Sequence, residues 1–478
     1  MVGPTATEAA TTATTRETGW ALASLALSML LSSLGVSVAN VALPTLARAF
    51  GASFQAVQWV VLAYLLAITI LIVGVGRLGD VVGRRRVLLG GILLFAVASA
   101  LCGLAPTLGT LIAARALQGL GAAALMALTV AFVGASVPPE RTGSAMGLLG
   151  TMSAIGTALG PSLGGLLIAG PGWRAIFLVM AGLGVVTFGL ALRWLPDHER
   201  KTTAGPLGFD LPGTLLLGLT LAAYALAMTV GHGRFAGANL ALLLAAAVGI
   251  GLFLAVEARV ASPLIRLSAF RDAGLSAGLI ANVLVSTVMM ATLVVGPFYL
   301  SRGLGLDAAT VGAVMAVGPV ISAFSGVPAG RTVDRFGAPA MVGGGLVAMT
   351  AGCLALSVLP GLLGVAGYIA ALAVLTPGYQ LFQAANNTTV MAGVGPDRKG
   401  VVSGLLSLSR NLGLITGASV MGTVFALAAA ADDVATAGPD AVAAGMRITF
   451  AVAAGLMVVA TLVATAGRSR RPLADGAP

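Results

Sequence analysis

Charged residues are scarce in this sequence. Only 9% of its 478 residues are charged, whereas 58% are apolar, and the mean hydropathy is +1.02. A soluble protein of this length needs far more charge to cover its surface. The composition therefore excludes a soluble globule and predicts an all-α polytopic membrane protein.

Cysteine and histidine are also nearly absent, with two residues of each. Cys102 and Cys353 lie in separate apolar runs, which excludes a disulfide framework and a metal cluster. His198 and His232 lie in loops, and no nucleophile–base pair accompanies them. The sequence has no Gly-Lys-Ser/Thr phosphate-binding motif either. We expect no enzyme activity, no metal, no bound cofactor and no use of ATP.

Long apolar runs are what the chain has in abundance. A helix needs about 20 apolar residues to cross the hydrocarbon core of a membrane, and fourteen runs meet this requirement. In the central pair, a re-entrant segment is an alternative to two full spans. The predicted spans are residues 20–43, 56–76, 87–104, 108–134, 143–168, 173–195, 211–230, 237–257, 274–300, 309–330, 340–358, 362–391, 400–431 and 446–466.

These runs divide the chain into two bundles. We expect six helices in residues 19–195 and six in residues 274–466, joined by a linker, residues 196–273, that contains two additional transmembrane helices. Residues 1–18 are rich in Thr and Ala and predict a disordered tail. They lack the basic start of a secretory signal, so the first helix is expected to be retained. Residues 467–478 are predicted to form the second tail.

Lysine and arginine are unevenly distributed over the loops. Most of the 26 basic residues lie in the tails and the even-numbered loops. By the positive-inside rule, this places both termini in the cytoplasm. The same bias explains the net charge of +10, so we expect no nucleic-acid partner. The basic residues of the odd-numbered loops are Arg48, Arg174, Arg234, Arg302 and Arg447.

An internal repeat relates the two bundles. The loop Gly76–Arg86 recurs in weaker form as Gly330–Gly337, and Val137–Gly143 recurs as Val394–Gly400. Two parallel six-helix repeats around an axis along the membrane normal are a plan of secondary transporters, which bind substrate between the repeats near the midplane. The alignment continues with Gly156 and Gly413, Gly160 and Gly417, and Gly165 and Gly422.

Five segments carry a family resemblance. They are the loop Gly76–Arg86, Arg115–Gly121 in span four, Gly156–Gly165 in span five, Asn40–Pro44 at the end of span one and Trp173–Phe177 at the start of span six. Together they resemble the major facilitator superfamily and, within it, the 14-helix drug:proton antiporters. The resemblance implies a multi-pass protein of the bacterial inner membrane. It also implies multidrug efflux, meaning export of small organic compounds by alternating access in exchange for protons.

One position departs from that family. Where span one usually carries an aspartate, this chain has Gly35. The resemblance therefore leaves the proton-coupling group unassigned, with Asp80 as a candidate and the proton gradient as the implied energy source. Two other functions stay open, a nutrient or metabolite facilitator on the same fold and a lipid-handling membrane protein.

The repeated loop carries an acid at a helix end. We expect Asp80 to pair with an arginine, or with the N-terminus of a neighbouring helix, in only one of two transporter states. The alternative is that the arginines set the topology and the glycines form a turn. The predicted latch consists of Asp80, Gly83, Arg84, Arg85 and Arg86, with Asp334 and Arg335 in the second half.

The predicted membrane interior lacks acids but holds two arginines. All 16 Asp and Glu fall in tails, in loops or at span ends, whereas Arg115 and Arg410 lie within spans four and thirteen. An arginine at such depth is costly and marks a functional site by default. The alternative is hydrogen bonding to backbone carbonyls at a helix crossing. Without a carboxylate to offset the desolvation of a cation, the pathway is predicted to favour neutral or anionic substrates over cationic ones.

Polar residues at helical spacing outline the predicted cavity, and methionine and aromatic residues add adaptable apolar contacts. The alternatives are interhelical hydrogen bonding and simple packing. We expect a monomer whose partners are a small-molecule substrate and membrane lipids. The predicted substrate-binding residues are Asn40, Arg115, Gln118, Asn282, Met289, Met290, Phe298, Tyr379, Gln380, Gln383, Asn387 and Arg410.

Span five carries a ridge of small residues, which is expected to pack closely on a neighbouring helix. Pro161 lies inside this ridge, where it removes a backbone hydrogen bond and predicts a bend. Its counterpart in the second half is Ala418, so the two halves should differ at this point. The ridge consists of Gly156, Gly160, Gly164 and Gly165.

Overall fold

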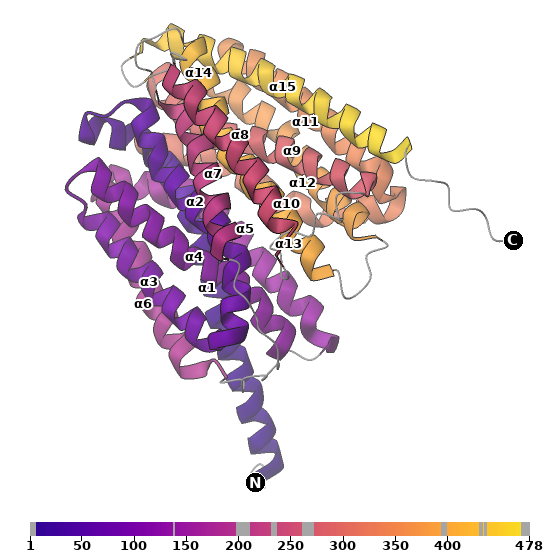
Figure 1. The fold of residues 1–478 in the computed structure, drawn as a ribbon. Coiled ribbons are helices and arrows are strands. Elements are labelled where there is room, and N and C mark those ends of the chain that lie inside the picture. Colours follow the sequence, from indigo (N-terminus) through magenta and orange to yellow (C-terminus); the bar gives the residue numbers. More distant parts are fainter. Residues whose placement is uncertain are drawn as a thin grey trace, which may run out of the picture.

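The computed structural model describes residues 6–136, 139–196, 211–230, 237–260, 272–392, 399–429, 434 and 437–469. Every regular element in these segments is a helix, and 14 candidate spans are long and apolar enough to cross a membrane. The predicted fold class is therefore confirmed. Figure 1 shows the first half of the chain and the second half as two helical bundles that lie side by side.

The first bundle holds six long helices, and one of them starts earlier than predicted. The tail that we expected to be disordered is helical from Ala6 onward, where it continues the first span. Alanine is the best helix former, and extending an existing helix avoids the cost of nucleation. The six helices are α1 (Ala6–Phe50), α2 (Phe54–Val82), α3 (Arg84–Leu104), α4 (Leu108–Ser136), α5 (Pro139–Ala169) and α6 (Trp173–Trp194).

The second bundle repeats this plan with six spans, the ninth to the fourteenth of the chain. A short π-helical segment, η4, interrupts the thirteenth span, and a similar segment, η2, ends the ninth. The elements are α9 (Ala273–Phe298), η2 (Tyr299–Gly303), α10 (Ala308–Phe336), α11 (Ala338–Leu363), α12 (Val365–Met391), α13 (Lys399–Thr416), η4 (Gly417–Met421), α14 (Gly422–Ala428) and α15 (Pro439–Ser469).

Glycine turns mark the repeat in the structure. Gly83 joins α2 to α3 with φ 109°, and Gly337 joins α10 to α11 with φ 84°, a backbone region in which side chains are disfavoured. These turns belong to the two copies of the repeated loop and lie at the same end of the bundles as the start of α1 and the end of α15. We call this the terminal end. The opposite end, with the turns at Gly51, Gly172 and Gly364, is the capped end.

Matched glycines pack matched helix pairs. A Cβ on Gly156 of α5 would lie 2.5 Å from the carbonyl oxygen of Leu30 in α1, and one on Gly160 would collide with Ser37. In the second half, a Cβ on Gly413 of α13 would lie 2.6 Å from Cβ of Ser286 in α9. The α1–α5 and α9–α13 contacts are therefore equivalent backbone approaches, one in each bundle.

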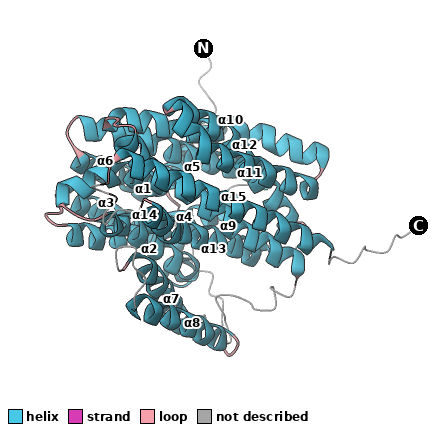
Figure 2. Cartoon of the chain, turned by 90° about the horizontal axis from the view of Figure 1, so that it is seen from above, coloured by secondary structure: helices cyan, strands magenta, loops and turns pink. Residues whose placement is uncertain are grey.

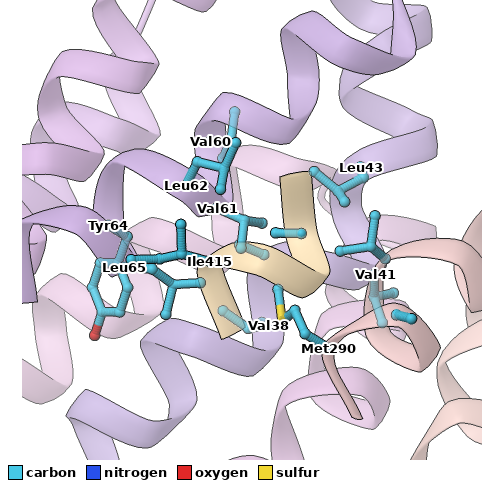
Figure 3. Close-up of a cluster of buried hydrophobic side chains, with 14 of the residues drawn as sticks. Val38, Val41, Leu43, Val60, Val61, Leu62, Tyr64, Leu65, Met290 and Ile415 are labelled. Carbon is cyan, nitrogen blue, oxygen red and sulfur yellow. The ribbon is translucent and has the colours of Figure 1, made fainter. Parts of the chain in front are cut away.

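The two halves lock together toward the capped end. Phe54 of α2 packs edge-on against Phe298 of α9 and Phe425 of α14, with ring centroids 4.7 and 5.6 Å apart. Deeper in the molecule, Val38 and Val41 of α1 join Met290 of α9 and Ile415 of α13 in one buried apolar cluster (Figure 3).

The inserted pair, α7 (Leu211–Thr229) and α8 (Gly237–Glu257), stands outside the two bundles. Figure 2 shows it projecting from the body beside α2. Both helices are long and apolar enough to span the membrane. The outer face of α8 exposes Leu240, Leu244 and Val248 to about 60% (61, 59 and 61%), which is the surface expected of a helix that faces lipid.

Candidate functional site

Arg115 is a completely buried cation in the first bundle. It lies on α4 with no exposed surface. Its Nε donates to the carbonyl oxygen of Val60 in α2 at 2.8 Å, and its Nη2 donates to the carbonyl oxygen of Gly35 in α1 at 2.9 Å. Its Nη1 donates to Oε1 of Gln118, one turn along α4. Backbone carbonyls at a helix crossing thus hold the guanidinium, which is the alternative that the sequence left open.

Tyr64 completes the surroundings of this cation. The guanidinium carbon lies 4.1 Å from the centre of the Tyr64 ring, a cation–π distance. The Tyr64 hydroxyl donates to the carbonyl oxygen of Ser32 at 2.9 Å. A Cβ on Gly35 would lie 2.5 Å from this hydroxyl oxygen. The phenol therefore occupies the space into which a side chain at position 35 would project.

The network continues through Gln118 into α3. Gln118 Nε2 donates to Oγ of Ser99 at 2.7 Å, and Ser99 donates to the carbonyl oxygen of Phe95 at 2.6 Å. Arg115 and Gln118 therefore tie α1, α2, α3 and α4 together. Each described contact of Arg115 is with a carbonyl, an amide or a ring, so its charge is not paired with a carboxylate of the described residues.

Several predicted substrate-binding residues are packing residues in this conformation. Asn282 donates to Oγ of Ser409 at 2.8 Å and to the carbonyl oxygen of Leu406 at 3.1 Å, which fastens α9 to α13. Six of the predicted residues are buried in this way, with at most 2% of each side chain exposed, so they do not face an open space here. They are Asn40, Arg115, Gln118, Asn282, Met290 and Phe298.

The predicted residues on α12 are more accessible. Tyr379, Gln380 and Gln383 are half-buried, and Asn387 is exposed. Gln383 donates to the Tyr379 hydroxyl at 3.0 Å, and Gln380 donates to the carbonyl oxygen of Ser322 in α10 at 3.0 Å. Met289 on α9 is also half-buried. The structure thus separates the predicted set into buried side chains from both halves and accessible side chains from the second half.

Arg410 differs from Arg115 in its exposure. It lies on α13, which begins at Lys399, and within a candidate membrane span. Its side chain is exposed. The two interior arginines are therefore different, since one is locked in packing and the other is open.

The latch arginines contact their own bundle. Arg85 Nε and Nη2 donate to the carbonyl oxygens of Leu195 and Leu192, at 2.9 and 2.7 Å. Arg84 Nη1 donates to the carbonyl oxygen of Ala131 at 3.3 Å. Cations at helix C-termini are stabilised by the free carbonyls and the helix dipole. The described bonds of these two arginines fasten α3 to the ends of α4 and α6.

The pairing of Asp80 that defines the predicted latch is not tested by the structure and stays a prediction. The side chain of Asp80 lies outside the described residues. Asp334 and Arg335 of the second copy are exposed, as is Arg86, and the guanidinium carbon of Arg335 lies 5.2 Å from the ring centre of Phe336.

Glu257 is the buried carboxylate among the acids whose side chains are described, with 3% exposed at the end of α8. Sequence reasoning placed it at a span end and passed over it. It also missed Tyr64, because the importance of this phenol depends on which side of α2 faces Gly35. No group of three or more His, Cys, Asp or Glu among the described residues could hold a metal ion.

Two six-helix bundles that meet at one end, with a buried cation in one and accessible polar side chains in the other, define a membrane transporter. The chain belongs to the Major Facilitator Superfamily, whose profile matches residues 25–418. It is accordingly a transporter rather than an enzyme, and a multi-pass protein of the cell membrane.

Named relatives include transporters of several kinds. The chain is 30% identical to the riboflavin transporter RibZ of Clostridioides difficile, over 84% of this chain and 87% of that one. It is 33% identical to the multidrug resistance protein Stp of Mycobacterium tuberculosis, over 81% of this chain and 72% of Stp. The multidrug efflux pump LfrA of Mycolicibacterium smegmatis is 31% identical, over 87% of this chain and 82% of LfrA.

Solved structures show the same fold. A bacterial homologue of the lysosomal transporter Spinster superposes with a TM-score of 0.69 at 16% identity, over 95% of this chain and 97% of that one. The xylose transporter XylE of E. coli gives a TM-score of 0.62 at 13% identity, over 96% of this chain and 99% of XylE.

Proposed function

We propose that this protein works as a monomer that exports small organic compounds from the cytoplasm by alternating access, in exchange for protons. The proposal places the terminal end in the cytoplasm, in agreement with its excess of Lys and Arg. Relatives that are named multidrug resistance proteins and efflux pumps support export. In this orientation the structure corresponds to a state closed toward the outside.

The substrate class follows from Arg115, which is the observation that carries the proposal. A permanent positive charge without a paired carboxylate creates a positive potential in a medium of low dielectric constant, and this potential acts beyond contact distance. A cationic substrate would be repelled as it loses its water, whereas an anion would be attracted and a neutral compound unaffected. The proposed cargo is therefore neutral or anionic.

Transport into proteoliposomes with an imposed pH gradient tests the class. The probes are a lipophilic cation (tetraphenylphosphonium), a neutral compound (riboflavin) and an organic anion (fluorescein). We expect gradient-driven transport of the neutral or anionic probe and not of the cation. Transport of the cation alone would refute the substrate class. Transport that ignores the gradient would refute proton exchange and favour a facilitator.

Two variants of Arg115 separate its charge from its hydrogen bonds. Arg115→Gln removes the charge and should reduce the preference for fluorescein over tetraphenylphosphonium by about tenfold or more, the effect of about 1.4 kcal/mol of electrostatic energy. Arg115→Lys keeps the charge and should keep the preference. Size-exclusion chromatography in detergent checks that each variant is folded. A preference that survives in the Gln variant would refute the role of the charge.

Proton coupling needs a group that titrates, and Gly35 cannot supply one. We propose Glu257 for this role, because it is the buried carboxylate of the described residues and buried carboxylates change protonation with their surroundings. Glu257→Gln should abolish the response to the pH gradient while exchange of substrate down its own gradient continues. An unchanged gradient response in this variant would exclude Glu257 as the coupling group.

A further inference from the structure

The inserted helix α7 contacts both bundles near the capped end. On one side, Nε1 of Trp59 in α2 donates to Oγ1 of Thr229 at 3.0 Å. On the other side, the Tyr224 hydroxyl donates to Oγ1 of Thr416 in α13 at 3.2 Å. Thr423 of α14 also donates to the carbonyl oxygen of Met228. The last two turns of α7 thus bridge the seam between α2 and α13–η4–α14.

The contact of α7 with α2 runs along most of the helix. Besides the Trp59–Thr229 bond at the capped end, a Cβ on Gly218 would lie 2.9 Å from Cδ1 of Ile70. The two pairs are in register for antiparallel helices, because residue numbers rise on α2 by as much as they fall on α7. About 16 Å of α7 therefore packs on α2, which attaches the inserted pair to the first bundle.

The contacts of the inserted pair with the second bundle are apolar near the terminal end and polar near the capped end. Near the terminal end they are apolar, because Phe253 of α8 belongs to a buried cluster with Leu405 of α13 and Leu279 of α9. Near the capped end they include the two directional hydrogen bonds of Tyr224 and Thr423. Apolar contacts are non-directional and tolerate sliding, whereas a hydrogen bond is lost once its angle and distance change.

A polar bond between the bundles joins residues that neighbour this bridge in the sequence. Gln58 Nε2 of α2 donates to the carbonyl oxygen of Ala418 in η4 at 2.8 Å. A Cβ on Gly422 would collide with the Gln58 amide, so this glycine makes room for it. π-Helical segments leave carbonyls free of their usual helical partners, and here one such carbonyl accepts from the opposite bundle. The bridge of α7 flanks this bond, because Gln58 adjoins Trp59, and Ala418 lies between Thr416 and Thr423.

We propose that α7 is a clasp that moves with the first bundle and holds the capped end closed through Tyr224 and Thr423. This inference rests on the alternating access of the proposed function. When the capped end opens, α7 stays on α2, and the bonds to Thr416 and from Thr423 break together with the Gln58–Ala418 bond. The apolar cluster around Phe253 remains as the pivot. The inserted pair thereby sets the balance between the two states without touching the substrate.

Three spin-label distances test the clasp. Gly109, Gly237 and Gly361 are exposed and lie at the capped end of α4, α8 and α11, and a Cβ at each meets no atom within 4 Å. They can be replaced in pairs by labelled cysteine, because the native Cys102 and Cys353 are buried. Pulsed electron–electron double resonance then measures 109–237, 237–361 and 109–361 in liposomes without substrate.

The expected result is a shift in two of the three distances. Tyr224→Phe with Thr423→Val should raise the population with long 237–361 and 109–361 distances by about threefold for each bond removed, the effect of an average interhelical hydrogen bond in a membrane. The 109–237 distance should not change. Thr461→Val is the matched control, because the hydrogen bond that its hydroxyl donates among the described residues stays within its own helix, to the carbonyl oxygen of Met457. Should the double variant not fold, Tyr224→Phe alone supports the same comparison.

Two results would overturn the inference. Distances equal to those of the Thr461→Val control would show that the bonds do not hold the capped end. A longer 109–237 distance with a constant 237–361 distance would show that α7 moves with the second bundle. Because these readings need no substrate, a protein that transports none of the three probes would refute the proposed export and leave the clasp standing.

Discussion

Two seams join the bundles at the capped end, and they occupy equivalent places in the repeat. In the α5–α10 seam, a Cβ on Gly312 would lie 2.5 Å from the carbonyl oxygen of Pro161 and 2.8 Å from Cα of Gly165. In the α2–α14 seam, Gln58 inserts its amide toward Ala418 and Gly422. Gln58 and Gly312 each lie four residues into their helices, α2 and α10.

The two seams thus solve one packing problem differently. Pro161 aligns with Ala418 and Gly165 with Gly422, so both seams present a carbonyl and a glycine. The first seam is backbone against backbone, and the second is a side chain against backbone, with α7 bonded to both of its sides. A backbone contact has no rotamer to adjust, whereas an amide can swing away. We therefore expect the first seam to fix the spacing of the halves and the second to regulate their separation.

The largest effect is expected at the backbone seam. Gly312→Ala places a methyl group against backbone atoms that cannot yield, and overpacking of this kind costs about 1–3 kcal/mol. The closed population should therefore fall by about tenfold, read as a longer 109–361 spin-label distance. Gly343→Ala is the control, because a Cβ at Gly343 meets nothing within 4 Å. A Gly312→Ala protein with the native distances would show that this seam is as adaptable as the other.

A smaller effect is expected at the amide seam. Gly422→Ala displaces the Gln58 side chain, and Gln58→Ala removes it, so each should raise the open population by about threefold. Because both changes break the same bond, the double variant should be no worse than either single variant. The 109–361 distance again provides the measurement. Additive effects of the two changes would mean that Gln58 and Gly422 do not act through one contact.

The smallest effect is expected at the start of α10, just before the backbone seam. Asp307 caps this helix, and its carboxylate accepts from the backbone N–H of Thr310 at 2.9 Å and from its hydroxyl at 2.8 Å. These hydrogen bonds, the backbone one first, hold the pKa of Asp307 below its ordinary value. The charged cap therefore stabilises the fold at pH values above the ordinary aspartate pKa and loses this effect as the pH falls through the lowered pKa.

Thermal unfolding measures this contribution. Asp307→Ala should lower Tm slightly at neutral pH. The difference from the parent protein should shrink as the pH falls below the ordinary aspartate pKa of about 3.9, and it should disappear below the lowered pKa of the folded state. Asp307→Asn retains a good N-cap without charge, so its Tm at neutral pH should lie between those of the parent protein and Asp307→Ala. A Tm difference that is constant over this pH range would show that the charge of Asp307 contributes nothing.

The sequence predicted the fold well and the site unevenly. Hydropathy and repeated motifs were sufficient for 14 spans, of which six lie in each of two related bundles and two form the inserted pair, because a membrane span is defined by its own length and composition. Arg115 was singled out by its cost, and the structure shows it buried against backbone carbonyls. Its partners Tyr64 and Val60 were missed, because they reach it from another helix. The sequence did not distinguish the exposed Arg410 from the buried Arg115, because exposure depends on which face of a helix meets its neighbours.

By itself, the sequence determined that this is a 14-helix membrane transporter with two related halves and a basic terminal end. These properties are local, because each apolar run, glycine turn and charged loop acts wherever the rest of the chain lies. Only the tertiary structure decided which arginine is buried, that a phenol fills the space beside Gly35, and how the two seams differ. Those depend on helix register and rotation, where a shift of one residue exchanges a lipid-facing side chain for one that faces another helix.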